Sequence, residues 1–98
     1  MTTSQLRVYQ LVDGSMDAFL QEWREHIVPM REAFGFSVSG AWTIPQTNGF
    51  VWVISHDGDF EEADRAYFAS DKRTALDPDP ARHIASTDAR LMQPVRVT

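Results

Sequence analysis

The stretch SVSGAWTIPQTNGFVWVISH, residues 37–56, decides the fold because it holds two strands and the turn between them. Strand-forming residues flank Asn48 and Gly49, a pair that tolerates the positive φ of a tight turn. The sequence therefore predicts a hairpin. Its register stays open, so Trp42 and Trp52 can lie on the same face of the sheet or on opposite faces.

The second strand of this hairpin is apolar on both faces. In FVWVI, residues 50–54, every position carries a large apolar side chain. Helices that lie on one side of a sheet cover only one of its faces. A second copy of the chain would bury the other face by packing its own sheet against it, and two-fold pairing is the commonest such arrangement. We therefore expect a homodimer.

The segment before the hairpin predicts one long amphipathic helix. It begins after Ser15, a plausible N-cap, and ends at Gly35, a C-cap signal. Pro29 lies inside it and removes one backbone donor, so we expect a kink there. The apolar residues that recur at helical spacing are Met16, Phe19, Leu20, Trp23, Ile27, Met30 and Phe34.

The remaining elements are short. Residues 5–12 and 88–97 predict the first and last strands, and Pro94 confines the last strand to an edge or a bulge. Three caps predict helical starts at Asp59, Ser70 and Asp79. The order strand, helix, strand, strand, helical region, strand is typical of a ferredoxin-like α+β protomer, an antiparallel four-stranded sheet with helices on one face.

Composition sets limits on domain number and partners. The 98 residues predict a single domain, 1–98, and 43% hydrophobic residues indicate a globular protein. A formal net charge of −5 opposes binding to nucleic acid, and we expect no membrane partner because no apolar run approaches a membrane span. With no leader pattern at the N-terminus, we expect a cytoplasmic location. The absence of cysteine excludes disulfides, thiolate nucleophiles and Cys-ligated zinc.

Three stretches carry a resemblance to a known family. WREHIVPMREAFGFSVSGAW (23–42), NGFVWVISHDGDFEEADRAYFASDKR (48–73) and LDPDPARHI (76–84) together resemble the NIPSNAP family over nearly the whole chain. The resemblance implies a dimeric α/β barrel, in which two ferredoxin-like protomers pack sheet to sheet and each encloses a cavity. It supplies no catalytic motif and implies no cofactor.

Three polar residues are candidates for catalysis. His83 lies near the start of the short helix capped by Asp79, where the positive end of the helix dipole favours a neutral imidazole that could act as a base. His26 follows Glu22 by four residues, so that carboxylate could hold it at the edge of a cavity. Asp64 lies in an apolar arc, where its pKa would rise unless an arginine pairs with it. Ordinary structural roles remain the alternative for all three.

Four aromatic residues are candidates for ligand binding: Trp42, Trp52, Phe50 and Tyr67. They could line a cavity for a flat apolar molecule, or they could fill the core. The three histidines show no spacing typical of a ligand pair, so we expect no metal site.

The sequence thus leaves three functions open. The first is binding of a small, mostly apolar molecule between sheet and helices. The second is a cofactor-independent monooxygenase or isomerase acting on a small aromatic or lactone substrate, and the third is a protein-interaction module without a ligand. Fold alone does not choose among them.

Overall fold

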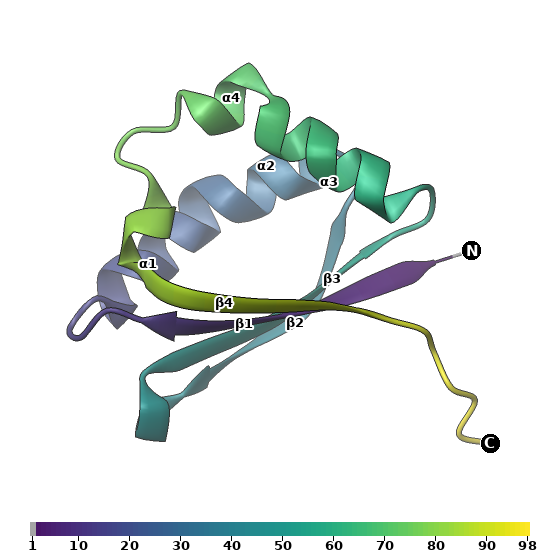
Figure 1. Ribbon diagram of the computed structural model, residues 1–98, viewed down its shortest axis with the longest axis horizontal. Coiled ribbons are helices and arrows are strands. Elements are labelled where there is room, and N and C mark those ends of the chain that lie inside the picture. Colours follow the sequence, from purple (N-terminus) through teal and green to yellow (C-terminus); the bar gives the residue numbers. More distant parts are fainter. Residues whose placement is uncertain (1) are drawn as a thin grey trace.

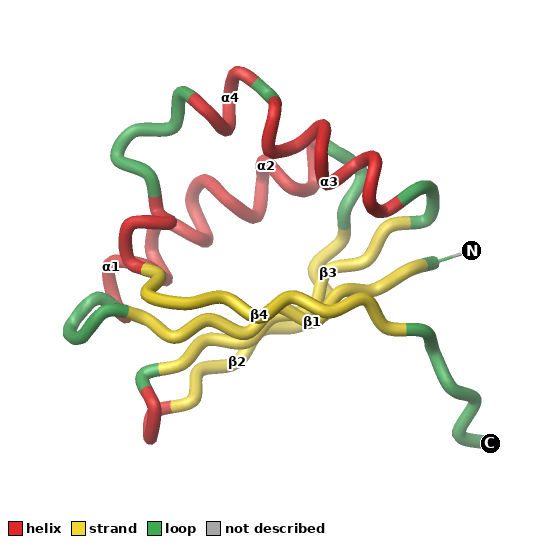
Figure 2. Tube along the Cα trace, viewed as in Figure 1, coloured by secondary structure: helices red, strands yellow, loops and turns green. Residues whose placement is uncertain are grey.

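The computed structural model describes residues 2–98, which form a four-stranded antiparallel sheet with helices α1 to α4 on one face (Figure 1). The strands are β1 (Thr3–Leu11), β2 (Ser37–Ile44), β3 (Gly49–His56) and β4 (Ile84–Met92), and their order in the sheet is β2-β3-β1-β4. Figure 2 shows the two layers, with the helices above the strands. The predicted ferredoxin-like α+β architecture is confirmed.

The first helical segment differs from the continuous helix that the sequence predicts. It consists of α1 (Met16–Glu22), a π-helical turn η1 (Trp23–Ile27) and α2 (Val28–Ala33). The amide of Val28 donates to the carbonyl of Trp23, five residues back. A wide turn of this kind accommodates Pro29, which lacks a donor and would crowd the carbonyl four residues before it. The irregularity expected at Pro29 therefore lies in the turn just before it.

Three of the four N-caps predicted from the sequence make a cap hydrogen bond, whereas the Ser15 hydroxyl donates to the carbonyl of Val12 and caps nothing. Asp59 Oδ1 accepts from the Glu62 amide at 3.1 Å and starts α3 (Phe60–Ala69). Ser70 Oγ accepts from the Arg73 amide at 3.2 Å and starts α4 (Asp71–Thr74). Asp79 Oδ1 accepts from the Ala81 amide at 2.9 Å, and the element that follows, η3 (Pro80–His83), is a 3-10 turn.

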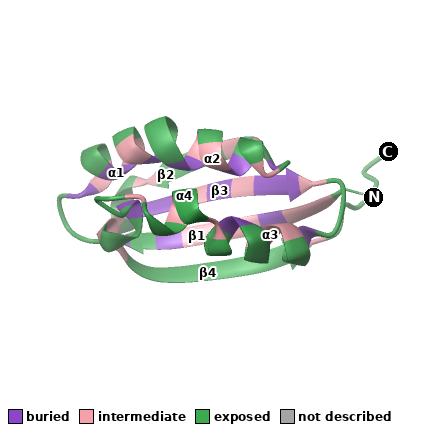
Figure 3. Ribbon diagram, turned by 90° about the horizontal axis from the view of Figure 1, so that it is seen from above, coloured by how far each residue is buried: buried purple, intermediate pink, exposed green. Residues whose placement is uncertain are grey.

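The last strand lies earlier than residues 88–97. β4 begins at Ile84 and ends at Met92, because this stretch pairs with β1 from Ile84 opposite Leu11 to Met92 opposite Ser4. The chain leaves the sheet before Pro94, which could not donate to a ladder. Figure 3 shows β4 exposed along nearly its whole length at the edge of the sheet.

The hairpin register separates the two strand tryptophans. Asn48 adopts the left-handed conformation with φ of 55°, as predicted, after a 3-10 turn η2 (Pro45–Thr47), whereas Gly49 already belongs to β3. Trp42 lies opposite Val51, and Ala41 lies opposite Trp52. The two indoles therefore point to opposite faces: Trp52 is 1% exposed under the helices, and Trp42 is 57% exposed on the other face.

An aromatic core fills the space between sheet and helices. Trp23 makes edge contacts with Phe50 and Trp52, with ring centroids 5.0 and 5.4 Å apart. Tyr9 and Phe19 extend the same cluster. Offset and edge contacts of this kind add to the hydrophobic gain from burial. None of the helices in residues 2–98 is long and apolar enough to cross a membrane.

The opposite side of the sheet, which we call the open face, is apolar at its centre. The register places Val8 beside Val51 and Leu6 beside Val53 on this face. All four side chains are only partly buried, because no helix covers them. Trp42 lies on the same face directly over Gly40, where an added Cβ would come within 2.8 Å of the indole ring.

Candidate functional site

A cavity of about 220 Å³ lies between the sheet and the helices. Strands β1, β3 and β4 contribute to its lining together with α1, η1, α2, α3, α4 and the turn at Pro80–His83, and the lining is mainly aromatic and apolar. Thr87 and Phe68 in this lining are exposed, so the cavity reaches the surface of the protomer. We refer to it as the central cavity.

The central cavity includes two of the four predicted ligand-binding residues. Trp52 and Tyr67 line it. Phe50 does not, because it is buried behind Trp23 in the aromatic core. Trp42 lies on the open face and is separated from the central cavity by the sheet.

The π-turn contributes directly to the cavity. Trp23 and Ile27, the first and last residues of η1, are both buried and both line it. Single π-turns inside α-helices occur frequently at functional sites.

Three arginines from distant parts of the chain also line the central cavity. Arg7 lies on β1, Arg31 on α2 and Arg73 on α4. Sequence reasoning did not find them. A signal existed for Arg31, which follows Ile27 by four residues on the buried side of the helix, and for Arg7, which alternates with Gln5 and Tyr9 toward the helix side. Nothing in the sequence marks Arg73.

Arg31 is the most buried of the three, with 1% of its surface exposed. Its Nη1 donates to Asp64 Oδ1 at 2.7 Å, and its guanidinium carbon lies 3.9 Å from the centroid of the Tyr67 ring. Burial lowers the pKa of Arg31, the ion pair with Asp64 opposes this, and the charge of Arg7 adds to the lowering. Asp64 is therefore in a salt bridge, the structural alternative considered for it, and the arginine comes from α2.

The other two arginines differ in their partners. Arg73 Nη2 lies 3.1 Å from Asp79 Oδ1. Arg7 has neutral hydrogen-bond partners: its Nε donates to the Tyr9 hydroxyl at 2.8 Å and its Nη1 to Gln5 Oε1 at 2.8 Å.

Tyr67 also lines the central cavity. Burial raises the pKa of Tyr67, while Arg31 and Arg73 oppose the change, so Tyr67 remains a neutral phenol.

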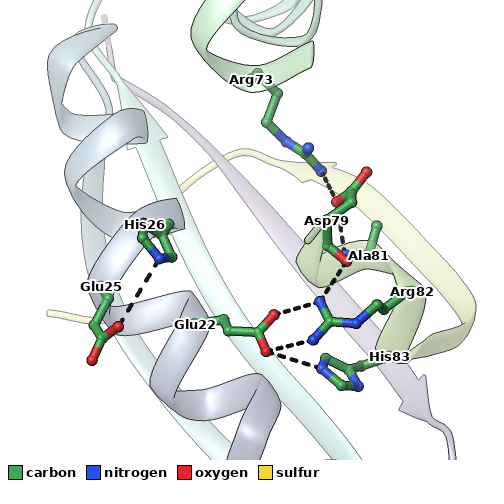
Figure 4. Close-up of polar contacts among 8 residues, drawn as sticks. All are labelled: Glu22, Glu25, His26, Arg73, Asp79, Ala81, Arg82 and His83. Carbon is green, nitrogen blue, oxygen red and sulfur yellow. Dashed lines mark hydrogen bonds and ion pairs between the residues drawn. The ribbon is translucent and has the colours of Figure 1, made fainter. Parts of the chain in front are cut away.

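A second polar cluster joins α1 to η3 (Figure 4). Glu22 binds Arg82 through both carboxylate oxygens, at 2.7 and 2.8 Å, and Glu22 Oε2 lies 3.2 Å from His83 Nε2. The hydrogen bonds from Arg82 hold the pKa of Glu22 below its ordinary value, and His83 adds to the lowering. An ionised carboxylate only accepts hydrogen bonds, so Nε2 of His83 carries the proton.

The position of His83 corrects the reasoning about the helix dipole. His83 is the last residue of the 3-10 turn η3 and not an early residue of a longer helix, so it does not lie at the start of a helix. It is largely buried and makes an edge contact with Phe19, which lines the central cavity. His83 itself lies just behind that lining.

The expected pairing of His26 with Glu22 is wrong. Glu22 faces η3, and the carboxylate beside His26 is that of Glu25, 4.0 Å from His26 Nε2 (Figure 4). The reason is the π-turn, because an i→i+5 turn no longer places residues four apart above one another. His26 is half-exposed and lies in a separate surface groove with Met30 and Lys72. The three candidates for catalysis thus occupy three different places.

One comparison with known proteins places the chain in a family, and a second shows which solved structures share its fold. The model of the NIPSNAP family matches residues 4–98. A NIPSNAP family protein from Agrobacterium tumefaciens superposes with a TM-score of 0.86 at 16% identity, covering 100% of this chain and 97% of that chain. An uncharacterised NIPSNAP domain protein from Burkholderia xenovorans gives 0.82 at 16% identity over 98% of this chain and 97% of its own.

Solved structures outside the NIPSNAP proteins share the fold. The crystal structure of an antibiotic biosynthesis monooxygenase superposes with a TM-score of 0.68 at 16% identity, covering 96% of this chain and 99% of that chain. A search of curated proteins found no significant match. At such low identities these likenesses show a shared protomer fold alone, whereas the family model covers all but the first three residues. The chain belongs to the NIPSNAP family.

Proposed function

We propose that this protein binds a small, mostly apolar molecule in the central cavity. The observation that carries the proposal is a cavity lined by aromatic side chains from both layers, among them Trp23, Trp52 and Tyr67. Binding sites for small molecules are concave and largely apolar, with a few polar groups that fix orientation. The same features support a ligand here.

The size of the cavity limits the ligand. A cavity of about 150 Å³ already accepts benzene, and the central cavity measures about 220 Å³. It therefore suits a single ring with a short substituent. A cavity of this size also argues against the third function considered, an interaction module whose interior is filled by side chains.

We also propose that the protein acts as a homodimer in the cytoplasm. The open face supports the dimer, because Leu6, Val8, Val51 and Val53 form an apolar centre that stays partly exposed and that no helix of residues 2–98 covers. Beyond the sheet, Val95 and Val97 are 83% and 92% exposed and add to the apolar surface available to a partner. Large exposed apolar patches mark interaction sites. The location rests on the sequence pattern alone.

Native mass spectrometry of freshly purified protein tests both proposals. We expect an assembly of twice the 11.1 kDa chain mass that carries extra mass, and we expect denaturation to release that mass. Ala81→Trp places a large ring in the lining and should abolish the extra mass. Ala66→Trp, on an exposed position of α3 outside the lining, is the matched control. A dimer at bare protein mass that also fails to bind any single-ring compound at millimolar concentration contradicts the ligand proposal.

The second candidate is a cofactor-independent monooxygenase or isomerase for a small aromatic or lactone substrate. The likeness to an antibiotic biosynthesis monooxygenase supports it, together with the Glu22–His83 pair beside the cavity. A base in this arrangement would act through His83 Nδ1, because Nε2 donates to Glu22.

Replacement of each candidate for catalysis tests this enzymatic alternative. Once a substrate is found, His83→Ala should abolish turnover with little effect on binding. His26→Ala and Asp64→Asn test the other two predicted residues in the same assay. Unchanged kcat in the His83 variant would contradict its role as a base.

A further inference from the structure

The polar side chains that line the central cavity are mostly hydrogen-bond donors. They comprise three guanidinium groups, two indole N–H groups, two phenols and one threonine hydroxyl. The lining contains no carboxylate, no side-chain amide and no histidine. Guanidinium and indole groups only donate hydrogen bonds. The side chains of this cavity therefore offer many donors and few acceptors.

The buried side-chain atoms that lack a hydrogen-bond partner point to the same place. Within residues 2–98 they are the indole nitrogens of Trp23 and Trp52 and the Nε atoms of Arg31 and Arg73. All four are N–H donors, and all four residues line the central cavity. Buried polar groups in native proteins almost always have partners. A cluster of unsatisfied donors around one cavity indicates an occupant that accepts hydrogen bonds.

The charge of the cavity is also unbalanced. Arg31 is paired with Asp64 and Arg73 with Asp79, whereas Arg7 makes no ion pair within residues 2–98 and donates to Tyr9 and Gln5. Three positive charges against two negative ones leave a net charge of +1. This occurs in a chain whose formal net charge is −5. A partly buried cation without a counter-charge is unfavourable, and an anion in the cavity would neutralise it.

We propose that the ligand of the central cavity is a small aromatic carboxylate, with its ring among the tryptophans and its carboxylate toward Arg7. The inference rests on the proposed binding function and specifies the class of ligand. An ionised carboxylate accepts up to four hydrogen bonds and donates none, which matches the donors of the lining. The guanidinium fork of Arg7 is partly occupied, since Nε and Nη1 already donate, so Nη2 is the group left to meet the ligand.

The same arrangement discriminates against neutral analogues. A primary amide of the same shape brings two N–H donors into a cavity whose side chains supply few acceptors, and it leaves the charge of Arg7 without a counter-charge. Sites built around hydrogen bonds to one group reject analogues that cannot make them more strongly than apolar pockets reject a change in size. The carboxylate and the amide of one compound are therefore a sensitive pair of probes.

The experiment is isothermal titration calorimetry of the purified dimer, or of whatever assembly forms, with phenylacetate and with phenylacetamide at neutral pH. We expect phenylacetate to bind at least about tenfold more tightly than the amide, as for a hydrogen bond to a charged group. Equal binding, or tighter binding of the amide, overturns the anionic ligand while the binding function stands. Failure of both probes to bind overturns the two together.

Variants locate the effect at Arg7. Arg7→Gln should weaken phenylacetate by about tenfold or more and leave phenylacetamide unchanged. Arg65→Gln makes the same chemical change on an exposed position of α3, outside the cavity, and should alter neither. If Arg7→Gln weakens the binding of phenylacetate and of phenylacetamide by the same factor, Arg7 has no role in recognising the charge. A neutral compound released in native mass spectrometry would contradict the proposal independently.

Discussion

Removing the acid of the Arg31–Asp64 ion pair should destabilise the fold more than removing the base. In Asp64→Ala, the guanidinium of Arg31 stays buried with 2% of its side chain exposed and loses the carboxylate 2.7 Å away. In Arg31→Met, the carboxylate left behind is 26% exposed and can reach water, while the methionine fills apolar space among the rings of Phe36, Tyr67 and Phe68.

The magnitude follows from this asymmetry. Breaking a buried pair by removing one partner costs about 3–5 kcal/mol, and the partial exposure of Asp64 places this case at the lower end, about 3 kcal/mol. The aromatic rings around Arg31 offset part of the loss through cation–π contacts. For a domain of this size, a loss of about 3 kcal/mol lowers the Tm by about 12–24 °C. Arg31→Met should cost about 1 kcal/mol less than Asp64→Ala.

Urea unfolding followed by tryptophan fluorescence measures both variants. Protein concentration is held constant, because assembly stabilises the folded state in a concentration-dependent way. Glu32→Ala is the matched control, since this neighbouring carboxylate on α2 is exposed and should change stability by less than about 0.5 kcal/mol. A loss in Asp64→Ala equal to that of the control, or smaller than that of Arg31→Met, refutes the reasoning.

Three further predictions concern other parts of the molecule. Val53→Lys places a charge at the centre of the open face and should yield a monomer of 11.1 kDa by light scattering, whereas Glu61→Lys on α3 should not. The hydrogen bonds from Arg82 lower the pKa of Glu22 on folding from its ordinary value of 4.5, so its stabilising contribution is complete above that pH and is lost as the pH falls through the folded-state pKa. The difference in unfolding free energy between wild type and Glu22→Gln should accordingly shrink on acidification, and a constant difference argues against it. Asn48→Ala should be less stable than Asn48→Gly by about 1 kcal/mol, because φ is 55° there and both variants lose the same side-chain bonds to the chain after β1.

Local signals in the sequence were reliable because the structures they specify are local. Asp59, Ser70 and Asp79 each cap the element that follows within three residues, so no distant contact could override them. Asn48 adopts the backbone conformation that its neighbours require for a tight turn. The ferredoxin-like architecture also followed from the order of the elements along the chain, since few arrangements connect such elements.

The face on which Trp42 lies could not be predicted in the same way. The first pair after the turn, Ile44 opposite Gly49, fixes the register through Trp42 opposite Val51, and the number of residues left unpaired in the turn has no unambiguous signal in the sequence. One residue of register moves a side chain to the opposite face. Trp42 therefore lies on the open face, although an indole side chain suits the lining of a cavity as well as it suits an interface.

The candidate site was only partly predictable for a related reason. Trp52 and Tyr67 were predicted and do line the central cavity, but Arg7, Arg31 and Arg73 lie far apart in the sequence and meet only through tertiary structure. The pairing of Glu22 with His83 joins residues 61 positions apart. A periodicity that assumes 3.6 residues per turn assigns Glu22 to His26, and the π-turn invalidates that assumption.

The π-turn also determines how the chain tolerates changes in its length. A deletion inside a regular α-helix rotates everything beyond it by about 100°, which would turn Arg31 away from the central cavity. A deletion within 24–26 would instead convert the wide turn into an ordinary one and leave the orientation of α2 unchanged. Pro29 would then lie in a regular helix and crowd the carbonyl four residues back, at a cost of about 3 kcal/mol. We therefore expect shorter natural or engineered versions of this helix to be viable only when the proline is replaced at the same time.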